Sequence, residues 1–550
     1  MTVDLQNRCE LTTLLLDGGL SSGNITELVE KLPRCYLSPL KYLSLQGNNM
    51  TGMLPNEISH LKSISFLNLK NNSISGPIAV GEFPLCLQSI SLLTFLDLSR
   101  NKFYGALPVW IGDLVNLQYL QLSYNMFYGD IPNSITNLDS IRFLNLAGNN
   151  ISGSSSTFDK ININDTKTSH DINGGGCSLT SANQSLPHLN LTNLEELDLS
   201  SNYLDSIESC WFWNLTSLKK LNLDAIGLHG LFPNVLGDMV SLQVLVLSSN
   251  QMTMKTTNLT TLCNLRILQL GESYSYGNIS ELIESLPQCA FSKLQELSLR
   301  GNQFTGILPN WLGQLTSLVI LDLSMNNITG PLPGIVDKLP DWFSNSLSKV
   351  IYLDISNNQI SGGLPTNWEI MSVEQLYLSS NQFTGEIPSL PRNIITLDIS
   401  SNSLTGSITG LRVLRHLNLA ENRLSGPIPS GGQLETLYTY NPLMYSGNNG
   451  LCGFPLQRSC PGNSTSKNGD LSKEKHGDQQ IPELHSDDQM FFLFGCGVGF
   501  MVGSWVVFFS LLFVKTWRIA YFRLFDSVYD KLYVFVVVNW GSLTGMKAAS

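Results

Sequence analysis

Aspartate recurs at one position of a repeating pattern, and its carboxylates are the first candidates for chemistry in this chain. Two carboxylates support general acid–base catalysis only where they converge on one substrate. Each of these aspartates instead lies between two aliphatic residues at the same place in its own repeat, which indicates a structural role. The five residues are Asp97, Asp198, Asp322, Asp354 and Asp398.

Motifs of catalysis are absent from the sequence. We find no P-loop, no His-Glu-x-x-His segment, no paired Cys-x-x-Cys zinc signature and no Gly-x-Ser-x-Gly between a strand and a helix. The seven histidines are scattered, and each is typical of a surface residue. We therefore expect no enzymatic activity, no metal and no cofactor, and we expect the function to lie in binding.

Aromatic residues recur two positions after the start of five successive repeats, on the strand face that looks away from the leucines. Exposed aromatic side chains in a row can anchor a peptide, protein or glycan ligand. Shielding of the strand edge is an equally good reading. Lys70, Arg100 and Gln121 are neighbours on that face. The candidate ligand-binding residues are Tyr42, Phe66, Phe95, Tyr119, Tyr124 and Phe143.

A repeat positions these residues, and its copy from Leu117 to Leu138 reads L-x-x-L-x-L-x-x-N-x-F-x-G-x-I-P. The next copy begins 24 residues later, at Ile141, and such a period indicates a stacked array. The pattern resembles the leucine-rich repeat, in its plant extracellular subtype. It predicts an α/β-type solenoid: a leucine-rich-repeat superhelix with a parallel concave sheet, plus one C-terminal transmembrane helix. Sixteen copies start at Leu11, Leu40, Ile64, Leu93, Leu117, Ile141, Leu194, Leu218, Leu242, Leu265, Leu294, Leu318, Val350, Val373, Ile394 and Leu414.

The spacing within one copy explains why it forms a coil. Leu120 and Leu122 alternate with polar residues, so they predict a strand whose leucines all point into the coil. The amide of Asn125 can bond backbone groups left unpaired in its own and neighbouring coils. Gly129 suits a bend with unusual dihedral angles, and Pro132 suits the side of the coil without the strand.

Ten cysteines include three candidate disulfide pairs. Cys9–Cys35 and Cys263–Cys289 share a separation of 26 residues, within two segments that are alike throughout. Each pair could join adjacent coils, with buried free thiols as the alternative, and Cys452–Cys460 would close the end of the array. Paired cysteines indicate an oxidising compartment.

Twelve N-x-S/T sequons also indicate a secreted ectodomain. The net charge of −11 argues against nucleic acid as a partner. The candidate glycosylation sites are Asn24, Asn49, Asn71, Asn150, Asn164, Asn183, Asn190, Asn214, Asn258, Asn278, Asn327 and Asn463.

Composition divides the chain of 550 residues into five parts. Residues 154–193 interrupt the array, and a degenerate seventeenth copy is expected near Ser169 with Cys177 at the asparagine position. The first repeat begins without a signal peptide or a cap, so we expect an incomplete reading frame or a shortened relative. The parts are a repeat array of about 16–17 copies (1–440), a disulfide-closed cap (441–460), an acidic extracellular spacer (461–489), a transmembrane helix (490–514) and a short cytoplasmic tail (515–550).

Residues 490–514 are 25 residues without a charge. As a helix they would extend about 38 Å and cross a hydrocarbon core of about 30 Å. Basic residues follow the span and acidic residues precede it, which predicts a single-pass type I protein in the lipid bilayer. Gly495, Gly499 and Gly503 lie on one face and predict a contact with another membrane-spanning helix.

Residues 11–525 resemble the plant leucine-rich-repeat receptor-like proteins. The most specific segments are LSGPIPSGGQLETLYTYNPLMYSGNNGLCGFPLQRSC and the glycine-patterned span with KTWRIAYFRLFD. The resemblance implies a plasma-membrane receptor without a kinase, which signals through a membrane-spanning adaptor or co-receptor kinase, and it makes the three glycines the adaptor contact. The chain departs from that family in lacking its signal peptide, its N-terminal cap and its usual island loop.

Three functional hypotheses follow. The first is a receptor that binds a ligand on the repeat surface and recruits a partner kinase in plant defence. The second is a developmental co-receptor or scaffold, which ligand-independent association with a kinase would favour. The third is a decoy or nonfunctional truncated receptor, which the missing start and the irregular gap favour.

Overall fold

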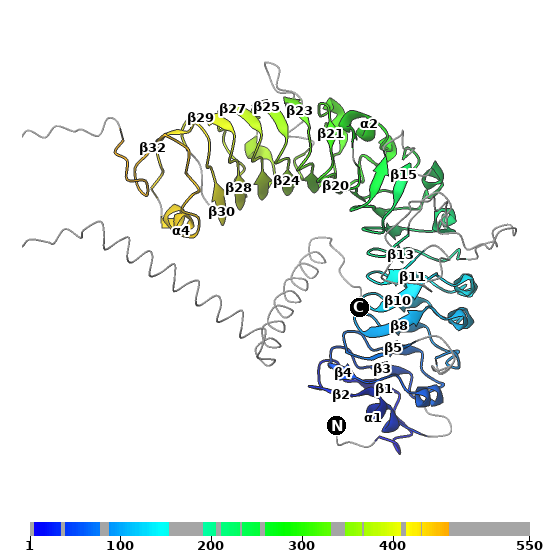
Figure 1. Cartoon of the computed structure of the whole chain (residues 1–550). Helices are drawn as coiled ribbons and strands as arrows, with labels where there is room; N and C mark the ends of the chain where they lie inside the picture. Colours follow the sequence, from blue (N-terminus) through cyan, green and yellow to red (C-terminus); the bar gives the residue numbers. More distant parts are fainter. Residues whose placement is uncertain are drawn as a thin grey trace, which may run out of the picture. The chain divides into compact units, whose positions relative to one another are not determined.

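The computed structural model places one compact unit over Met1–Ser464 and a second over Thr465–Ser550. Figure 1 shows the coils of the first unit stacked in chain order, from β1 to β30. The structure describes residues 5–34, 39–77, 87–152, 191–204, 211–231, 234–253, 259–274, 276–331, 347–365, 368–408, 414–430 and 432–460.

One parallel sheet of 16 strands runs through all the coils. Every strand begins two residues after one of the repeat starts read from the sequence, so the predicted solenoid with a long parallel sheet is confirmed. The strands are β1 (Thr13–Leu15), β3 (Tyr42–Ser44), β5 (Phe66–Asn68), β7 (Phe95–Asp97), β9 (Tyr119–Gln121), β11 (Phe143–Asn145), β13 (Glu196–Asp198), β14 (Lys220–Asn222), β16 (Val244–Val246), β18 (Ile267–Gln269), β20 (Glu296–Ser298), β22 (Ile320–Asp322), β24 (Tyr352–Asp354), β26 (Gln375–Tyr377), β28 (Thr396–Asp398) and β30 (His416–Asn418).

Leucines of these strands form one continuous core. Leu120 lies between two outward-facing residues of β9 and is fully buried, as are Leu117 and Leu122 on either side of the strand. Since one coil cannot cover its own leucines, each coil depends on its neighbours for burial.

An asparagine ladder holds the turn that follows each strand. The side-chain amide of Asn125 donates to the carbonyl oxygens of Leu122 in its own coil and Leu98 in the preceding coil, both at 3.0 Å. Its carbonyl oxygen accepts the N–H of Phe103, also in the preceding coil, at 3.1 Å. The predicted role of this amide in bonding its own and a neighbouring coil is therefore confirmed.

Six smaller parallel sheets lie beyond the asparagine turns of the described coils. Gly129 ends one of these strands with a φ of 75°, which glycine adopts without strain. The strands are β2 (Gly23–Asn24), β4 (Met50–Thr51), β6 (Ser75–Pro77), β8 (Lys102–Ala106), β10 (Met126–Gly129), β12 (Asn150–Ile151), β15 (His229–Leu231), β17 (Gln251–Thr253), β19 (Gly277–Asn278), β21 (Phe304–Thr305), β23 (Thr329–Pro331), β25 (Gln359–Gly363), β27 (Gln382–Glu386), β29 (Ser403–Thr405), β31 (Ser425–Pro427) and β32 (Gly450–Cys452).

Among the described residues, short 3-10 helices lie in half of the coils. Pro132 directly precedes one of them, on the side of the coil that carries no strand, as its fixed φ suggests. The helices are η1 (Asn56–His60), η2 (Val109–Asp113), η3 (Asn133–Asn137), η4 (Trp211–Asn214), η5 (Asn234–Asp238), η6 (Gln288–Ala290), η7 (Asn310–Gln314) and η8 (Trp368–Ile370).

The two segments with like sequences fold alike. Helix α1 (Ile25–Glu30) follows β2, and helix α2 (Ile279–Glu284) follows β19. The side chain of Asn24 caps α1, and the side chain of Asn278 accepts the N–H of Ser280 in the same way. A third helix, α4 (Gly432–Tyr440), packs Leu434 and Leu437 at the C-terminal end of the core.

The coil that starts at Ile141 stacks directly on the coil that starts at Leu194. Strand β11 pairs with β13, with Phe143 opposite Glu196. The amide of Asn202 donates to the carbonyl oxygen of Leu146 across this junction at 3.0 Å. The sheet therefore has no strand between these two coils, and the seventeenth copy expected near Ser169 itself lies outside the described residues.

The predicted membrane span, residues 490–514, also lies outside the described residues. Among the residues that are described, no helix has both the length and the apolar character that crossing a membrane requires.

Candidate ligand-binding face

Five aromatic side chains stand opposite one another on neighbouring strands and form an aromatic ladder. Pairing of β3, β5, β7, β9 and β11 aligns their first residues, which are Tyr42, Phe66, Phe95, Tyr119 and Phe143. The last four rings stack nearly parallel, with centroids 4.2, 4.3 and 4.2 Å apart and interplanar angles of 13°, 7° and 6°. Tyr42 is tilted by 42° and lies 6.0 Å from Phe66.

Stacking determines which parts of the rings a ligand can reach. Each inner ring has both faces covered by its neighbours, so its edge is what remains open to solvent. Phe66, Phe95, Tyr119 and Phe143 are half-buried, and Tyr42 at the end of the ladder is 46% exposed. The ladder therefore offers a line of ring edges rather than ring faces.

Tyr124 does not belong to this ladder. It lies in the turn after β9 with a φ of 53°, and its ring packs against Gly148 of the next coil, where an added Cβ would lie 2.6 Å from Cδ1. The guanidinium carbon of Arg100 lies 5.3 Å from the centroid of the same ring, within the range of a cation–π contact. Tyr124 is 56% exposed, so a ligand can reach it. Since it lies in the turn and not in the strand, it forms with Arg100 a feature separate from the aromatic ladder.

Charged residues continue the register of the ladder in the next two coils. Glu196 stands opposite Phe143, and Lys220 stands opposite Glu196. Lys220 pairs with Glu196 at 2.7 Å, and Lys219 pairs with Glu195 at 2.9 Å. We call these four residues the ion-pair block. The hydrogen bond from Lys219 lowers the pKa of Glu195, so this carboxylate stays ionised.

The phenol of Tyr119 lies one strand inside the end of the aromatic ladder, since Phe143 stands between Tyr119 and Glu196 in the register. Burial, with smaller contributions from the charges of Asp97 and Glu196, raises the pKa of Tyr119 to about 12. The phenol therefore keeps its proton at physiological pH and can donate a hydrogen bond to a ligand.

The recurring aspartates are held in turns. Asp97 accepts the backbone N–H and the hydroxyl of Ser99 at 2.9 and 2.6 Å, and Asp322 accepts the same groups of Ser324 at 3.0 and 2.6 Å. Burial raises the pKa of both carboxyls, against the opposing hydrogen bonds from these serines. These aspartates are therefore structural residues of the repeat. No cluster of three potential metal ligands occurs among the residues that the structure describes.

Sequence reasoning placed the ladder residues on one face but missed three details of the face. These are the stacking of the rings, the contact of Arg100 with Tyr124, and the two ion pairs that end the ladder. The signal for the ion pairs was available, because the start-to-start spacing aligns Glu195 with Lys219 and Glu196 with Lys220. The stacking depends on side-chain rotation, which spacing alone does not determine.

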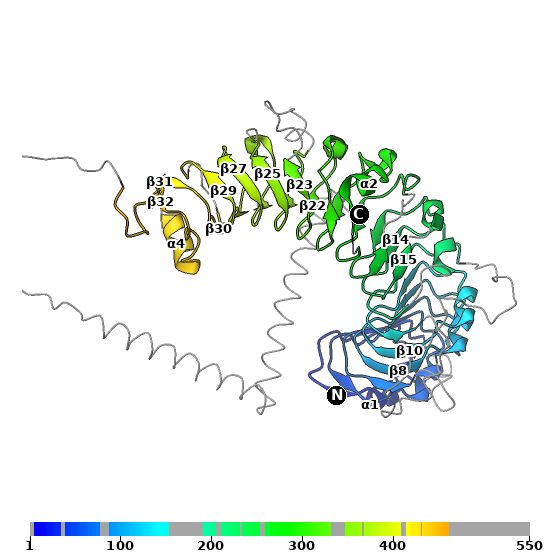
Figure 2. The same cartoon turned by 45° about the horizontal axis from the view of Figure 1, so that its top comes forward.

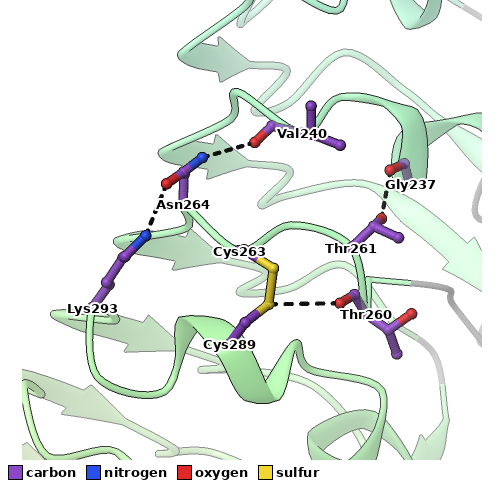
Figure 3. The surroundings of a disulfide bond; sticks show 8 residues. All are labelled: Gly237, Val240, Thr260, Thr261, Cys263, Asn264, Cys289 and Lys293. Atoms are coloured by element: carbon purple, nitrogen blue, oxygen red, sulfur yellow. Dashed lines mark hydrogen bonds between the residues drawn. A yellow bond between two sulfur atoms is a disulfide. The ribbon is translucent and has the colours of Figure 1, made fainter.

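Disulfides form at two of the predicted places. Figure 3 shows Cys263 bonded to Cys289 of the next coil. Near it, Asn264 accepts from Lys293 at 2.9 Å and donates to the carbonyl oxygen of Val240 at 3.1 Å, so these contacts link three coils. Cys452 is bonded to Cys460 in the cap. Cys9 is also disulfide-bonded, and its predicted partner Cys35 lies outside the described residues.

The candidate glycosylation sites are in different environments. The side chains of Asn24, Asn49, Asn71, Asn150 and Asn327 are exposed, and Asn278 is half-buried. The remaining predicted sites lie outside the part of the chain that the structure describes. They are the side chain of Asn214, the sequons at residues 164, 183, 190, 258 and 463, and the predicted helix contact at Gly495, Gly499 and Gly503.

Comparison with known sequences and structures agrees with the fold. Leucine rich repeat family models match residues 91–151, 177–228 and 192–252, and residues 39–61, 293–315, 317–345, 349–370, 372–394 and 413–434, together just over half of the chain. The chain is 32% identical to Receptor-like protein 32 of Arabidopsis thaliana over 25% of this chain and 14% of that protein. It is 29% identical to Receptor like protein 22 of the same plant over 39% of this chain and 24% of that protein.

This chain is a leucine-rich-repeat protein. The two relatives above are both plant receptor-like proteins. The matched segments span a quarter or less of the length of these two relatives. Among solved structures, the ectodomain of the receptor kinase GASSHO1/SCHENGEN3 from Arabidopsis thaliana, in complex with CASPARIAN STRIP INTEGRITY FACTOR 2, has a TM-score of 0.57 and 27% identity over 80% of this chain and 50% of that chain. The PEPR1–AtPEP1 structure has a TM-score of 0.54 and 25% identity over 82% and 63% of the two chains.

Proposed function

We propose that this receptor-like protein binds a peptide or protein ligand along the aromatic ladder. The observation that carries the proposal is the alignment of five aromatic residues on the outward face of the long sheet. Solvent-accessible aromatic residues in a continuous row are typical of binding surfaces, because their burial by a partner supplies much of the affinity.

The dimensions and polarity of the face suit an extended peptide. At a strand spacing of about 4.8 Å the ladder is roughly 20 Å long, which matches about six residues of extended chain. Ring edges favour contact with aliphatic side chains or with the faces of ligand aromatic rings. A charged group of the ligand would then reach the ion-pair block, whose half-exposed side chains can exchange partners.

The similarity to the complex of GASSHO1/SCHENGEN3 supports a ligand on a repeat array of this kind. We infer further that residues 441–460 cap the array, that residues 461–489 form a spacer and that residues 490–514 anchor the chain in the plasma membrane with the repeats outside. We infer that signalling runs through a partner kinase, and we place its contact at Gly495, Gly499 and Gly503. A role in plant defence is part of this proposal.

A binding measurement with matched variants tests the ladder. The full chain, purified from plant cells in detergent micelles, is used to select binders from a library of synthetic 12-residue peptides. Phe95→Ala should weaken the selected peptides by roughly tenfold or more, as expected for a residue at the centre of an interface. Gln375→Ala, at the same strand position of a distant coil, should leave binding unchanged. Equal binding to Phe95→Ala and the unaltered chain would refute the proposed face.

Recruitment of a kinase is tested separately by crosslinking in plant membranes. The full-length chain should recover a receptor kinase, and a Gly499→Leu variant should recover less of it because the larger side chain keeps the two helices apart. Recovery of no receptor kinase by the unaltered chain would count against signalling through such a partner, while leaving the ligand-binding test independent.

A further inference from the structure

A second exposed aromatic patch lies on the four-stranded sheet of β6, β8, β10 and β12. Tyr104, Met126 and Tyr128 are 44%, 51% and 49% exposed, while Phe103 and Phe127 between them are fully buried. Met126 stands directly opposite Tyr104 in the strand register. We call these three exposed residues the flank patch; Figure 2 labels its strands β8 and β10.

A glycosylation sequon borders this patch. Asn150 is exposed and stands directly opposite Tyr128, because β12 pairs with β10. Ser152, the third residue of the sequon, forms a bridge with Tyr203, whose side chain is 63% exposed. The sequon Asn150-Ile151-Ser152 is therefore flanked by an exposed tyrosine on each side.

Opposite residues on adjacent strands project their side chains to the same face, about 5 Å apart. A sugar attached to Asn150 would consequently begin within reach of the Tyr128 ring. The C–H groups of a pyranose ring pack well on the electron-rich face of an aromatic ring. We propose that Asn150 carries an N-linked glycan whose first N-acetylglucosamine packs on Tyr128 and covers the flank patch.

Asn327 provides a matched site without the aromatic neighbour. It is exposed and follows the ladder asparagine Asn326, just as Asn150 follows Asn149. The bridge between Ile307 and Thr329 places Thr305, two residues earlier, opposite Asn327. A glycan on Asn327 would lie next to Thr305, which has no ring on which a sugar could stack. Of these two sequons, only Asn150 has an aromatic residue opposite it.

The inference rests on the proposed extracellular location, since N-glycosylation requires entry into the secretory pathway. It assigns a carbohydrate of the chain itself, rather than a protein partner, to the flank patch. Occupancy of Asn49, Asn71 and Asn327 reports on the location alone, which keeps the two claims separable.

Site-resolved nitration of tyrosine tests the inference. The full chain is expressed in plant cells that make only high-mannose glycans, purified in detergent micelles, and treated with tetranitromethane. Glycopeptide mass spectrometry should find Asn150 occupied. Tyr128 should react at least about fivefold faster in Ser152→Ala, which loses the sequon, than in Ser152→Thr, which keeps it; about 1 kcal/mol of stacking gives that ratio. Endoglycosidase H, which leaves the first sugar attached, should preserve the protection.

Two controls define the alternative outcomes. Tyr124, exposed in the turn after β9, should react equally in both variants. A Thr305→Tyr variant should gain a tyrosine whose protection depends on the Asn327 glycan and disappears with Thr329→Ala.

Three results would overturn the inference: occupied Asn327 with empty Asn150, equal nitration of Tyr128 in the two Ser152 variants, or a Tyr128 that stays slow without the sugar because another partner covers it. Absence of glycan from all described sequons would overturn the proposed location as well.

Discussion

At the scale of single residues, two polar side chains in a coil bond backbone groups that the turning chain would otherwise leave unpaired. The buried side chain of Asn125 donates to carbonyl oxygens of its own coil and of the preceding coil, and it accepts an N–H of the preceding coil. Asp97 supplies only an acceptor, and it brings a charge into a buried position at a cost that its raised pKa reflects. Substitutions at these two positions should therefore have opposite effects.

Replacing Asn125 by alanine should lower the urea midpoint of unfolding of the repeat array. The variant would leave the buried N–H of Phe103 without a partner, which costs about 1–3 kcal/mol. The carbonyl oxygens of Leu98 and Leu122 would each lose one bond but keep those from Asn101 and Asn149. Asn116→Ala is the matched control, because Asn116 is exposed and makes one bond, to Ser91. Equal urea midpoints for the two variants would contradict the stabilising role of the asparagine ladder.

Replacing Asp97 by asparagine should preserve or raise stability at pH 7. The amide oxygen of asparagine can still accept both bonds from Ser99, and the buried charge is removed. Because the folded-state pKa of Asp97 is raised, acidification protonates the folded protein first, so the advantage of the variant should shrink as the pH falls through that pKa. Urea midpoints of both proteins, measured at a series of pH values below 7, test this. An advantage that grows on acidification would contradict it.

At the scale of elements, close stacking of coils leaves little room where the 3-10 helices meet. Gly112 of η2 lies against η3, and an added Cβ would lie 2.1 Å from the backbone carbonyl oxygen of Ser134. Backbone atoms cannot move aside as the end of a flexible side chain can, so the position requires glycine. The repeat pattern in the sequence does not reveal this, because the nearby coil carries Thr136 at a comparable place in η3.

Gly112→Ala should therefore cost about 1–3 kcal/mol, the usual penalty for overpacking a tight interior. Gly363→Ala serves as the control, since its nearest neighbour beyond the adjacent residues would be 3.9 Å from the new Cβ. Hydrogen exchange of the η2 and η3 amides measures the local effect. Unchanged protection in Gly112→Ala would show that the two elements can separate without loss.

The sequence predicted the elements of the long sheet better than the details of its outward face. The period alone located every strand of the long sheet. The likeness of the Cys9 and Cys263 segments suggested only like disulfides, and the structure adds that both segments carry a short helix, α1 and α2, in corresponding places. The sequence did not reveal the parallel stacking of Phe95 on Tyr119 or the pairing of Tyr128 with Asn150, because these depend on rotamers and on the stagger of the smaller sheets.

At the scale of the whole repeat unit, the strands of the long sheet keep one register, so the same position of each coil lies on the same face. When the residue type at that position changes from coil to coil, the character of the face changes along the stack. Aromatic residues occupy the position in the coils of β3 to β11, and charged residues occupy it in β13 and β14. In the sequence, residues 154–193 come between β12 and β13. A ligand that spans the boundary between the aromatic and the charged residues would be apolar at one end and charged at the other.

Reversing the ion-pair block tests this polarity. Glu196→Lys should weaken a selected peptide that carries a positive end, and the double variant with Lys220→Glu should restore the ion pair but present reversed charges to the ligand. We expect the single change to cost roughly fivefold to tenfold in affinity at low salt and less at high salt, because these side chains are half-exposed. Binding that responds to neither charge nor salt would contradict a charged end of the ligand.

The most direct test of the central claim is a photocrosslink from the ladder itself. A benzoylphenylalanine placed at position 95 of the full chain should crosslink to the peptides selected by that chain, and the same residue at position 375 should not. Crosslinking at position 95 alone would place the ligand on the aromatic ladder. Equal crosslinking at both positions, or crosslinking at position 375 alone, would contradict the assignment of the ladder as the ligand-binding face.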